Sequence, residues 1–394
     1  MLKLLRFFCC ARFVIICLAD LRAENSPASP PGSSTAAATA LPPELQAELD
    51  ALARSAWLPS TTARGSLGWR DNVLLSPFAP IERVFARGEL EAILMRPMRN
   101  RWEFISFLNG EVLRYFSPPE ETHGEQQWSL HTEGRWQPFD RARLALKGAG
   151  YMRDMVIDLS ETEASRVVAP TRVRGGYVVA ATRVTWRGFH VEPSVQLKRT
   201  DYRDYAGDYD EVRTGGRVEW RHRERFGISA AWFEGRRRYD QRTQFNAGGR
   251  ALPGTHLRFR QRDGELKLRS AWERGGEWFV AGTLGRMENR DHTSGYFDYN
   301  QRRARLELGW NRAGWRLNLD ADGRRMDYVV QTVGAGIAPP PRISDDYEVM
   351  LRAERELDDR WTVFGEHRWE RSRSNELEFN YRANTVLAGV QRNF

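Results

Sequence analysis

The chain has 394 residues, 28% of them charged, and a formal net charge of +8. After the first twenty residues, no apolar run approaches the roughly 20 residues that a membrane-spanning helix needs, so a helical membrane protein is excluded. A membrane-spanning sheet stays open, because only every second residue of its strands meets lipid.

Residues 1–23 have the pattern of a cleaved secretory signal peptide. Lys3, Arg6 and Arg12 supply the positive charge, Phe13 to Ala19 form a short apolar core, and Leu21 to Ala23 form the cleavage site. A single anchor helix is the alternative. All three cysteines lie in this segment (Cys9, Cys10 and Cys17), so we expect neither a disulfide nor a thiolate metal site in the mature chain. The basic charge then suits an anionic membrane surface, and we expect no nucleic acid partner.

Residues 24–65 form the next predicted unit. Ala, Pro, Ser and Thr dominate positions 24–43, as in a flexible linker. From Pro43 to Leu58 the leucines have helical spacing, which predicts one short periplasmic helix. This helix is either a simple stub or an element that plugs the following domain or binds a partner.

From Ser66 to Phe394, apolar and charged residues alternate. Trp315, Leu317 and Leu319 share one face of such a segment, whereas Arg316 and Asp320 share the other. Period two over many segments predicts antiparallel strands with one apolar and one charged face. Short connections such as Arg187-Gly188 alternate with long ones such as residues 244–262. We count about sixteen strands, with fourteen as the alternative.

Tryptophans gather near the predicted short turns, as expected of an aromatic belt at one membrane interface. The belt comprises Trp102, Trp136, Trp186, Trp272, Trp278, Trp310, Trp315 and Trp361. A soluble β-sandwich would instead bury large aromatic residues in the middle of its strands.

The final strand alternates and ends on Phe394. Together with the alternating segments, it resembles the closing strand of bacterial outer-membrane β-barrel proteins of the porin-like class. The resemblance implies an all-β transmembrane antiparallel up-and-down barrel over residues 66–394. It also implies export to the bacterial outer membrane, lipid and lipopolysaccharide as surroundings, and contact of Phe394 with the barrel-assembly machinery.

The charged strand face is the main functional clue, because Arg or Lys facing lipid at the midplane costs about 2–4 kcal/mol. We therefore predict that this face lines the lumen. The predicted lining residues are Arg217, Glu219, Arg221, Lys267, Arg269, Arg303, Arg305, Glu307, Arg316, Asp320, Arg352, Glu354, Glu366 and Arg368. Either they line a water-filled pore that slightly prefers anions, or their salt bridges fill a closed lumen.

Two loop regions suggest weaker sites. Arg236, Arg237 and Arg238, with further arginines at 258, 260 and 262, suggest contact with lipopolysaccharide phosphates, the alternative being a solvated face. The acidic stretch from Asp201 to Glu211 offers oxygen ligands for Ca²⁺, but it lacks the EF-hand spacing, and a solvated loop is favoured. No metal or other cofactor is predicted.

No catalytic motif is present, so we predict that the chain is not an enzyme. The minority alternative is a hydrolase built on loop histidines such as His123, His256 and His292. The leading hypothesis is a porin-like channel for small solutes. The second is a structural, assembly or secretion barrel with a closed lumen. The oligomeric state does not follow from the sequence.

Overall fold

The computed structural model describes residues 57–394 except 118–123, 160–164, 204, 223–224 and 335. The predicted signal peptide, the linker and nearly all of the predicted helix from Pro43 to Leu58 lie outside these residues. Within the described part, no helix is long and apolar enough to cross a membrane. The one helical element found there is the 3₁₀ turn η2, Leu377–Phe379.

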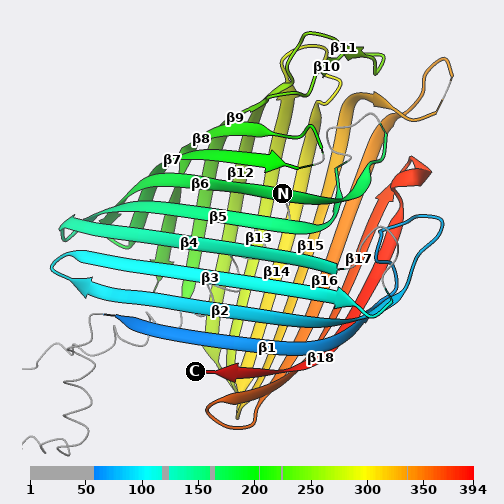
Figure 1. Cartoon of the computed structure of the whole chain (residues 1–394). Coiled ribbons are helices and arrows are strands. Elements are labelled where there is room, and N and C mark those ends of the chain that lie inside the picture. Colours follow the sequence, from blue (N-terminus) through cyan, green and yellow to red (C-terminus); the bar gives the residue numbers. More distant parts are fainter. Residues whose placement is uncertain (1–56, 118–123, 160–164, 204, 223–224, 335) are drawn as a thin grey trace, which may run out of the picture. The chain divides into compact units, whose positions relative to one another are not determined.

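Sixteen antiparallel strands form a closed barrel (Figure 1), which confirms the predicted fold and strand number. They are β1 (Leu58–Arg70), β2 (Arg83–Arg99), β3 (Trp102–Tyr115), β4 (Gly124–Phe139), β5 (Ala142–Asp158), β6 (Val168–Trp186), β7 (Phe189–Tyr202), β8 (Tyr209–His222), β9 (Phe226–Tyr239), β12 (Arg258–Glu273), β13 (Glu277–Asp291), β14 (Tyr299–Arg312), β15 (Trp315–Thr332), β16 (Pro341–Glu356), β17 (Trp361–Ser374) and β18 (Tyr381–Asn393).

The barrel closes where β1 pairs with β18, from Thr62 opposite Asn393 to Arg70 opposite Thr385. We call this pairing the seam. The expected barrel start at Ser66 falls inside β1, which begins at Leu58. The sequence obscured this start because Pro59 to Thr62 show no apolar alternation.

The connections alternate in length around the barrel. Tight turns such as Arg187-Gly188 join strands at one end, where positive φ angles of 45° and 82° fit the reversal. The other end carries the long connections, among them residues 240–257, which include the small hairpin of β10 (Gln244–Phe245) and β11 (Ala251–Leu252). Strand β12 starts at Arg258, so the arginines at 258, 260 and 262 belong to a strand and not to the predicted loop.

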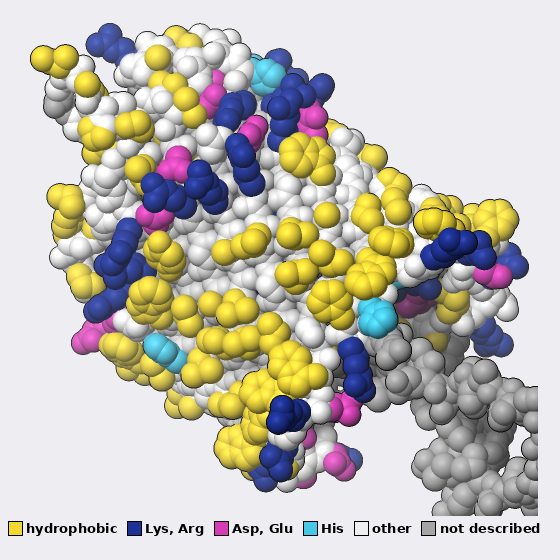
Figure 2. Space-filling view, turned by 180° about the vertical axis from the view of Figure 1, so that it is seen from behind, with side chains coloured by type: hydrophobic (Ala, Val, Ile, Leu, Met, Phe, Trp, Pro, Cys, Tyr) yellow, Lys and Arg dark blue, Asp and Glu magenta, His cyan; other side chains and the backbone are white. Residues whose placement is uncertain are grey.

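The two faces of each strand differ in chemistry. Exposed apolar side chains alternate with buried or half-buried polar ones, as on β14, where Leu306 is 40% exposed and Gln301 is 5% exposed. In a closed barrel the exposed apolar set forms the outer surface. Figure 2 shows these side chains as a band across the barrel, with Lys and Arg gathered above it. The polar set, which we call the inner wall, faces the inside.

Candidate functional site: the charged inner wall

All fourteen residues predicted to line the lumen lie on strands, at positions that alternate with the outer apolar side chains. The structure joins thirteen of them into ion pairs, most of which connect different strands. The pairs fall into three groups.

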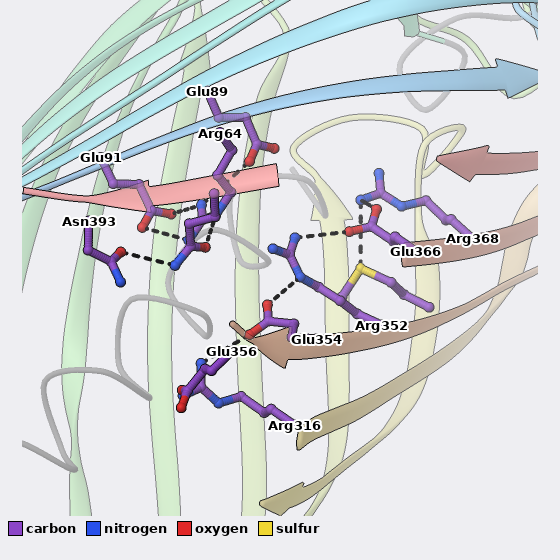
Figure 3. A network of polar contacts seen from close by, with 12 residues as sticks. Arg64, Glu89, Glu91, Arg316, Arg352, Glu354, Glu356, Glu366, Arg368 and Asn393 are labelled. Atoms are coloured by element: carbon purple, nitrogen blue, oxygen red, sulfur yellow. Dashed lines mark hydrogen bonds and ion pairs between the residues drawn. The ribbon is translucent and has the colours of Figure 1, made fainter. Parts of the chain in front are cut away.

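The first group lies where β16 and β17 approach β1 and β2 (Figure 3). The Arg352 guanidinium binds Glu354 at 2.6 Å and Glu366 at 3.3 Å. Arg316 also binds Glu354, at 3.0 Å, and Arg368 binds Glu366 at 3.5 Å. Glu354 is thus shared between two guanidinium groups, and Glu366 among three, since Arg87 of β2 lies 3.9 Å from it.

Acidic residues that the sequence analysis did not single out complete this group. Glu348 lies 3.7 Å from Arg368. On β2, Glu89 and Glu91 bind Arg64 of β1 at 3.4 and 2.8 Å. Alternation on β2 places both glutamates on the inner wall, and this signal was present in the sequence.

The second group lies on β12, β14 and β15. Arg305 binds Glu307 at 3.1 Å and also contacts Asp320, while Lys267 lies 3.7 Å from Glu307. In the same group, Arg303 binds Asp263 at 2.9 Å and Glu265 at 3.2 Å. Lysine and arginine of one strand therefore reach carboxylates on the second strand along.

The third group is centred on Glu219 of β8. Arg221 binds it at 2.7 Å, Arg183 of β6 at 3.0 Å and Arg269 of β12 at 3.9 Å. Three cations around one carboxylate leave a local excess of positive charge.

The remaining predicted residue, Arg217, has no carboxylate partner among the described residues. Arg153 of β5 likewise has no carboxylate partner among the described residues. Its guanidinium lies 5.8 Å from the centre of the Tyr151 ring. Arg153 was not among the predicted lining residues, although alternation with the outer residues of β5 marks it as inward.

Charge is distributed unevenly around the inner wall. On β5 to β9, nine inward cations share the strands with three inward carboxylates, Glu192, Glu211 and Glu219. Three of the nine also pair with acids on the flanking strands β3, β4 and β12. The nine are Arg143, Lys147, Arg153, Arg183, Lys198, Arg213, Arg217, Arg221 and Arg237.

Strands β16 and β17 lie opposite that sector in the closed strand order, β3 lies two strands beyond β5, and acids outnumber cations at the inward positions of all three. The inward positions of β3 include Glu103 and Glu111 and no cation, since its one arginine, Arg114, lies on the outer face. Those of β16 include four carboxylates and two arginines. A basic sector therefore faces an acidic sector inside one barrel.

Two long connections meet over the inside of the barrel. Val73, in the connection from β1 to β2, is fully buried against inward residues such as Phe85 and Phe364. Arg166, in the connection from β5 to β6, donates a 2.5 Å hydrogen bond to the carbonyl of Leu75 and lies over the Tyr381 ring. This contact, which we call the mouth contact, links connections from different parts of the strand order.

The eight tryptophans of the predicted belt all lie at the end of the barrel with tight turns. Most are exposed outward, from 38% for Trp136 and Trp278 to 58% for Trp186. Neighbouring rings touch across strands, with Trp272 and Trp278 stacked at 6.3 Å. Phe394 is 68% exposed at the same end, and its backbone N–H donates to the carbonyl of Thr61 at 2.9 Å.

The structure separates the three arginines that were expected to contact lipopolysaccharide together. Arg236 and Arg238 are exposed on the outer face, whereas Arg237 is 4% exposed on the inner wall and binds Glu211 at 2.8 Å. Successive strand residues point to opposite faces, so Arg237 cannot join a surface cluster with its neighbours. The expectation for Arg237 is therefore corrected.

The acidic stretch from Asp201 to Glu211 does not form a cation cage within the described residues. Asp201 and Asp210 both bind Arg199, at 2.7 and 3.2 Å, and Asp208 accepts the backbone N–H of Tyr202. Glu211 points into the barrel. Arginines and backbone groups thus occupy the oxygens that a Ca²⁺ site would need.

Among the loop histidines, His123 lies outside the described residues. His256 and His292 lie in different long connections, and in the described part of the chain neither imidazole hydrogen-bonds to a serine or a carboxylate. The elements of a catalytic triad are therefore not assembled around these two histidines.

A closed barrel with an apolar outer surface and a charged inner wall is the architecture of outer-membrane β-barrel proteins, and this chain has that architecture. No protein-family model and no curated protein sequence matches it. Solved structures with a similar fold include OccAB3 of Acinetobacter baumannii, with 10% identity, a TM-score of 0.45, and coverage of 86% of this chain and 99% of that one.

Two further structures are similar at the same level. The anion-selective porin from Comamonas acidovorans has 11% identity and a TM-score of 0.44, over 86% of this chain and 99% of that one. OccK2 of Pseudomonas aeruginosa, solved in complex with glucuronate, has 10% identity and a TM-score of 0.45, over 86% of this chain and 98% of that one. At this similarity the three structures show the fold alone.

Proposed function

We propose that the barrel is a channel for the passive passage of small solutes, with a preference for anions. The observation that carries the proposal is the basic sector, in which cations on β5 to β9 outnumber carboxylates by nine to three. Sixteen strands are also enough to enclose an aqueous lumen, since barrel diameter grows with strand number.

The sector has a direct electrostatic consequence. Fixed cations that are not fully matched by acids raise the local concentration of mobile anions along the lumen wall. The opposite acidic sector does not cancel this effect along the basic wall. Instead, it favours solutes that keep their negative end toward β5 to β9.

The sharpest test uses the two inward arginines that lack a carboxylate partner. We expect Arg153→Gln and Arg217→Gln together to shift the reversal potential of the reconstituted protein toward cation selectivity in a salt gradient across a planar bilayer. Arg187→Gln combined with Arg274→Gln is the matched control, since both residues are exposed beside tight turns. If the variant with both Arg153→Gln and Arg217→Gln forms open channels whose ion selectivity is unchanged, this sector does not set an anion preference.

The dense ion pairs favour a second candidate, a barrel whose lumen is closed by its own salt bridges and which serves assembly or secretion. The group in Figure 3 shows how two strands can be tied across the inner wall by shared carboxylates. A folded barrel that stays silent in the bilayer would support this candidate. Deleting residues 24–56, which leaves β1 intact, would then abolish partner binding without unfolding the barrel.

A further inference from the structure

Six exposed arginines form a row on the outer surface. They are Arg236 on β9, Arg260 and Arg262 on β12, Arg286 on β13, Arg302 on β14 and Arg325 on β15. We call them the outer arginine row. Arg236, Arg260 and Arg262 belonged to the cluster considered from the sequence, and strand register adds Arg286, Arg302 and Arg325 to them.

The row borders the apolar band on the side away from the tryptophans. Along β13 the outward residues run from Trp278 at the tight-turn end to Leu284, and Arg286 is the next outward position. On β14, which runs in the opposite direction, Ala304 is the last apolar outward residue counted from the tight-turn end, and Arg302 is the next outward position. If the apolar band lies in the hydrocarbon, the row lies at the headgroups of the leaflet nearer the long connections (Figure 2).

Strand register brings like charges into direct opposition. Arg286 pairs with Arg302, and Arg302 pairs with Arg325 on the next strand. Residues directly opposite each other have Cβ atoms only about 5 Å apart, and like charges there are destabilising. Three arginines that face one another on consecutive strands therefore repel one another, and anions placed among them offset this repulsion.

Acids on the same surface compensate only part of this charge. Glu234 binds Arg260 at 2.6 Å, Glu288 binds Arg286 at 3.0 Å and Asp327 binds Arg325 at 2.9 Å. Arg302, in the middle of the row, has no carboxylate partner among the described residues. The row contains no lysine, and the planar guanidinium is the side chain that binds phosphate oxygens in bidentate fashion.

The row occupies one sector of the barrel. On β2, the outward positions from Val84 to Leu94 are all apolar or glycine. Outward arginines also lie elsewhere on the barrel, such as Arg172 on β6 and Arg199 on β7, and these two bind acids on the same surface at 2.6 and 2.7 Å. The outer arginine row differs from these two, because it sets three arginines opposite one another on consecutive strands.

We propose that the outer arginine row binds the phosphate groups of lipid A, the phosphorylated lipid of the outer leaflet, with Arg286, Arg302 and Arg325 at its centre. The acyl chains of the lipid would lie against the apolar band below the row. The proposal does not depend on conduction, so it can fail or succeed independently of the proposed function.

The test measures lipid binding by native mass spectrometry of the full-length, detergent-purified protein titrated with bisphosphorylated lipid A. The variant combines Arg286→Gln, Arg302→Gln and Arg325→Gln. The control combines Arg187→Gln, Arg274→Gln and Arg312→Gln, which removes the same charge at the tight-turn end. We expect the variant to bind at least about tenfold more weakly, since charge-assisted hydrogen bonds are lost, and the control to bind like the unaltered protein.

Phosphatidylglycerol is the second probe, because it offers one phosphodiester in place of two phosphate groups. Equal affinity for phosphatidylglycerol and lipid A would overturn the assignment to lipid A. Unchanged lipid A affinity in the variant, or an equal loss in the control, would overturn the site. Folding of each variant is checked by its heat-dependent mobility in gels. If the triple variant does not fold, the single variant Arg302→Gln is used in its place.

Discussion

At the scale of single residues, the sequence pattern decides which face of the barrel a charged side chain occupies, whereas strand register decides which ion-pair partner it has. Alternation alone assigns Arg217 and Arg305 to the same wall, and it would have assigned Arg237 to that wall too. The partners follow from register, which joins Arg305 to Asp320 of the next strand and leaves Arg217 without an acid. The sequence could therefore predict which residues are inside, but it could not predict which of them keep a net charge.

The buried pair of Arg237 and Glu211 gives a residue-scale prediction for stability. Both side chains are 4% exposed, so neutralising Glu211 removes a buried carboxylate from beside a desolvated guanidinium. We expect Glu211→Gln to lower the free energy of unfolding by about 3–5 kcal/mol. Urea unfolding of the variant and of the unaltered protein, in detergent or lipid vesicles, measures this change in the free energy of unfolding.

The matched change for this prediction is Glu234→Gln, which breaks an exposed pair with Arg260 on the neighbouring strand. Exposed pairs contribute about 0–1 kcal/mol, so this variant should unfold almost like the unaltered protein. Equal effects of the two changes would show that the burial of Arg237 and Glu211 does not govern their contribution.

At the scale of elements, the seam depends on close backbone approach. A Cβ added at Gly389 of β18 would lie 2.3 Å from the carbonyl oxygen of Gly65 and 2.6 Å from the Cβ of Ser66, both on β1. Such a contact requires the two strands to shift. Glycine at position 389 therefore allows β1 and β18 to pair closely.

We expect Gly389→Ala to destabilise the folded barrel by about 1–3 kcal/mol, the usual cost of overpacking. The thermal midpoint of the heat-dependent gel shift measures the change. Gly88→Ala on β2 is the control, because a Cβ there meets nothing within 4 Å. A Gly389 variant as stable as the Gly88 variant would mean that the seam adjusts without cost.

The elements themselves were largely predictable. Period two along β14 and β15 and the glycine-containing turns gave sixteen strands, because each strand repeats the same two-faced pattern. The start of β1 was missed since Pro59 and Thr62 lack that pattern. The inward path of Val73 was missed because nothing local distinguishes a connection that folds into a barrel from one that extends outward.

At the scale of the whole molecule, the mouth contact joins connections that are far apart in the chain. Arg166 reaches Leu75 and Tyr381, and its backbone N–H donates to Glu378 at 3.2 Å. These contacts hold the connection between β5 and β6 against those of β1–β2 and β17–β18. If the proposed channel is open at this end, a solute would pass this contact on entry.

We expect Arg166→Ala to raise single-channel conductance while leaving ion selectivity nearly unchanged, because the basic sector lies deeper on the strands. Arg172→Ala is the control: Arg172 belongs to the same hairpin, but it binds Asp154 at 2.6 Å on the outer face. Conductance that is equal in both variants would show that the mouth contact does not limit flow.

The seam also fixes the timing of biogenesis. The partner of β1 is β18, so β1 has one unpaired edge until β18 has been made. An unpaired edge cannot be satisfied within hydrocarbon. Insertion of this barrel must therefore follow the synthesis of β18, and until then its first strand must be shielded from the strands of other chains.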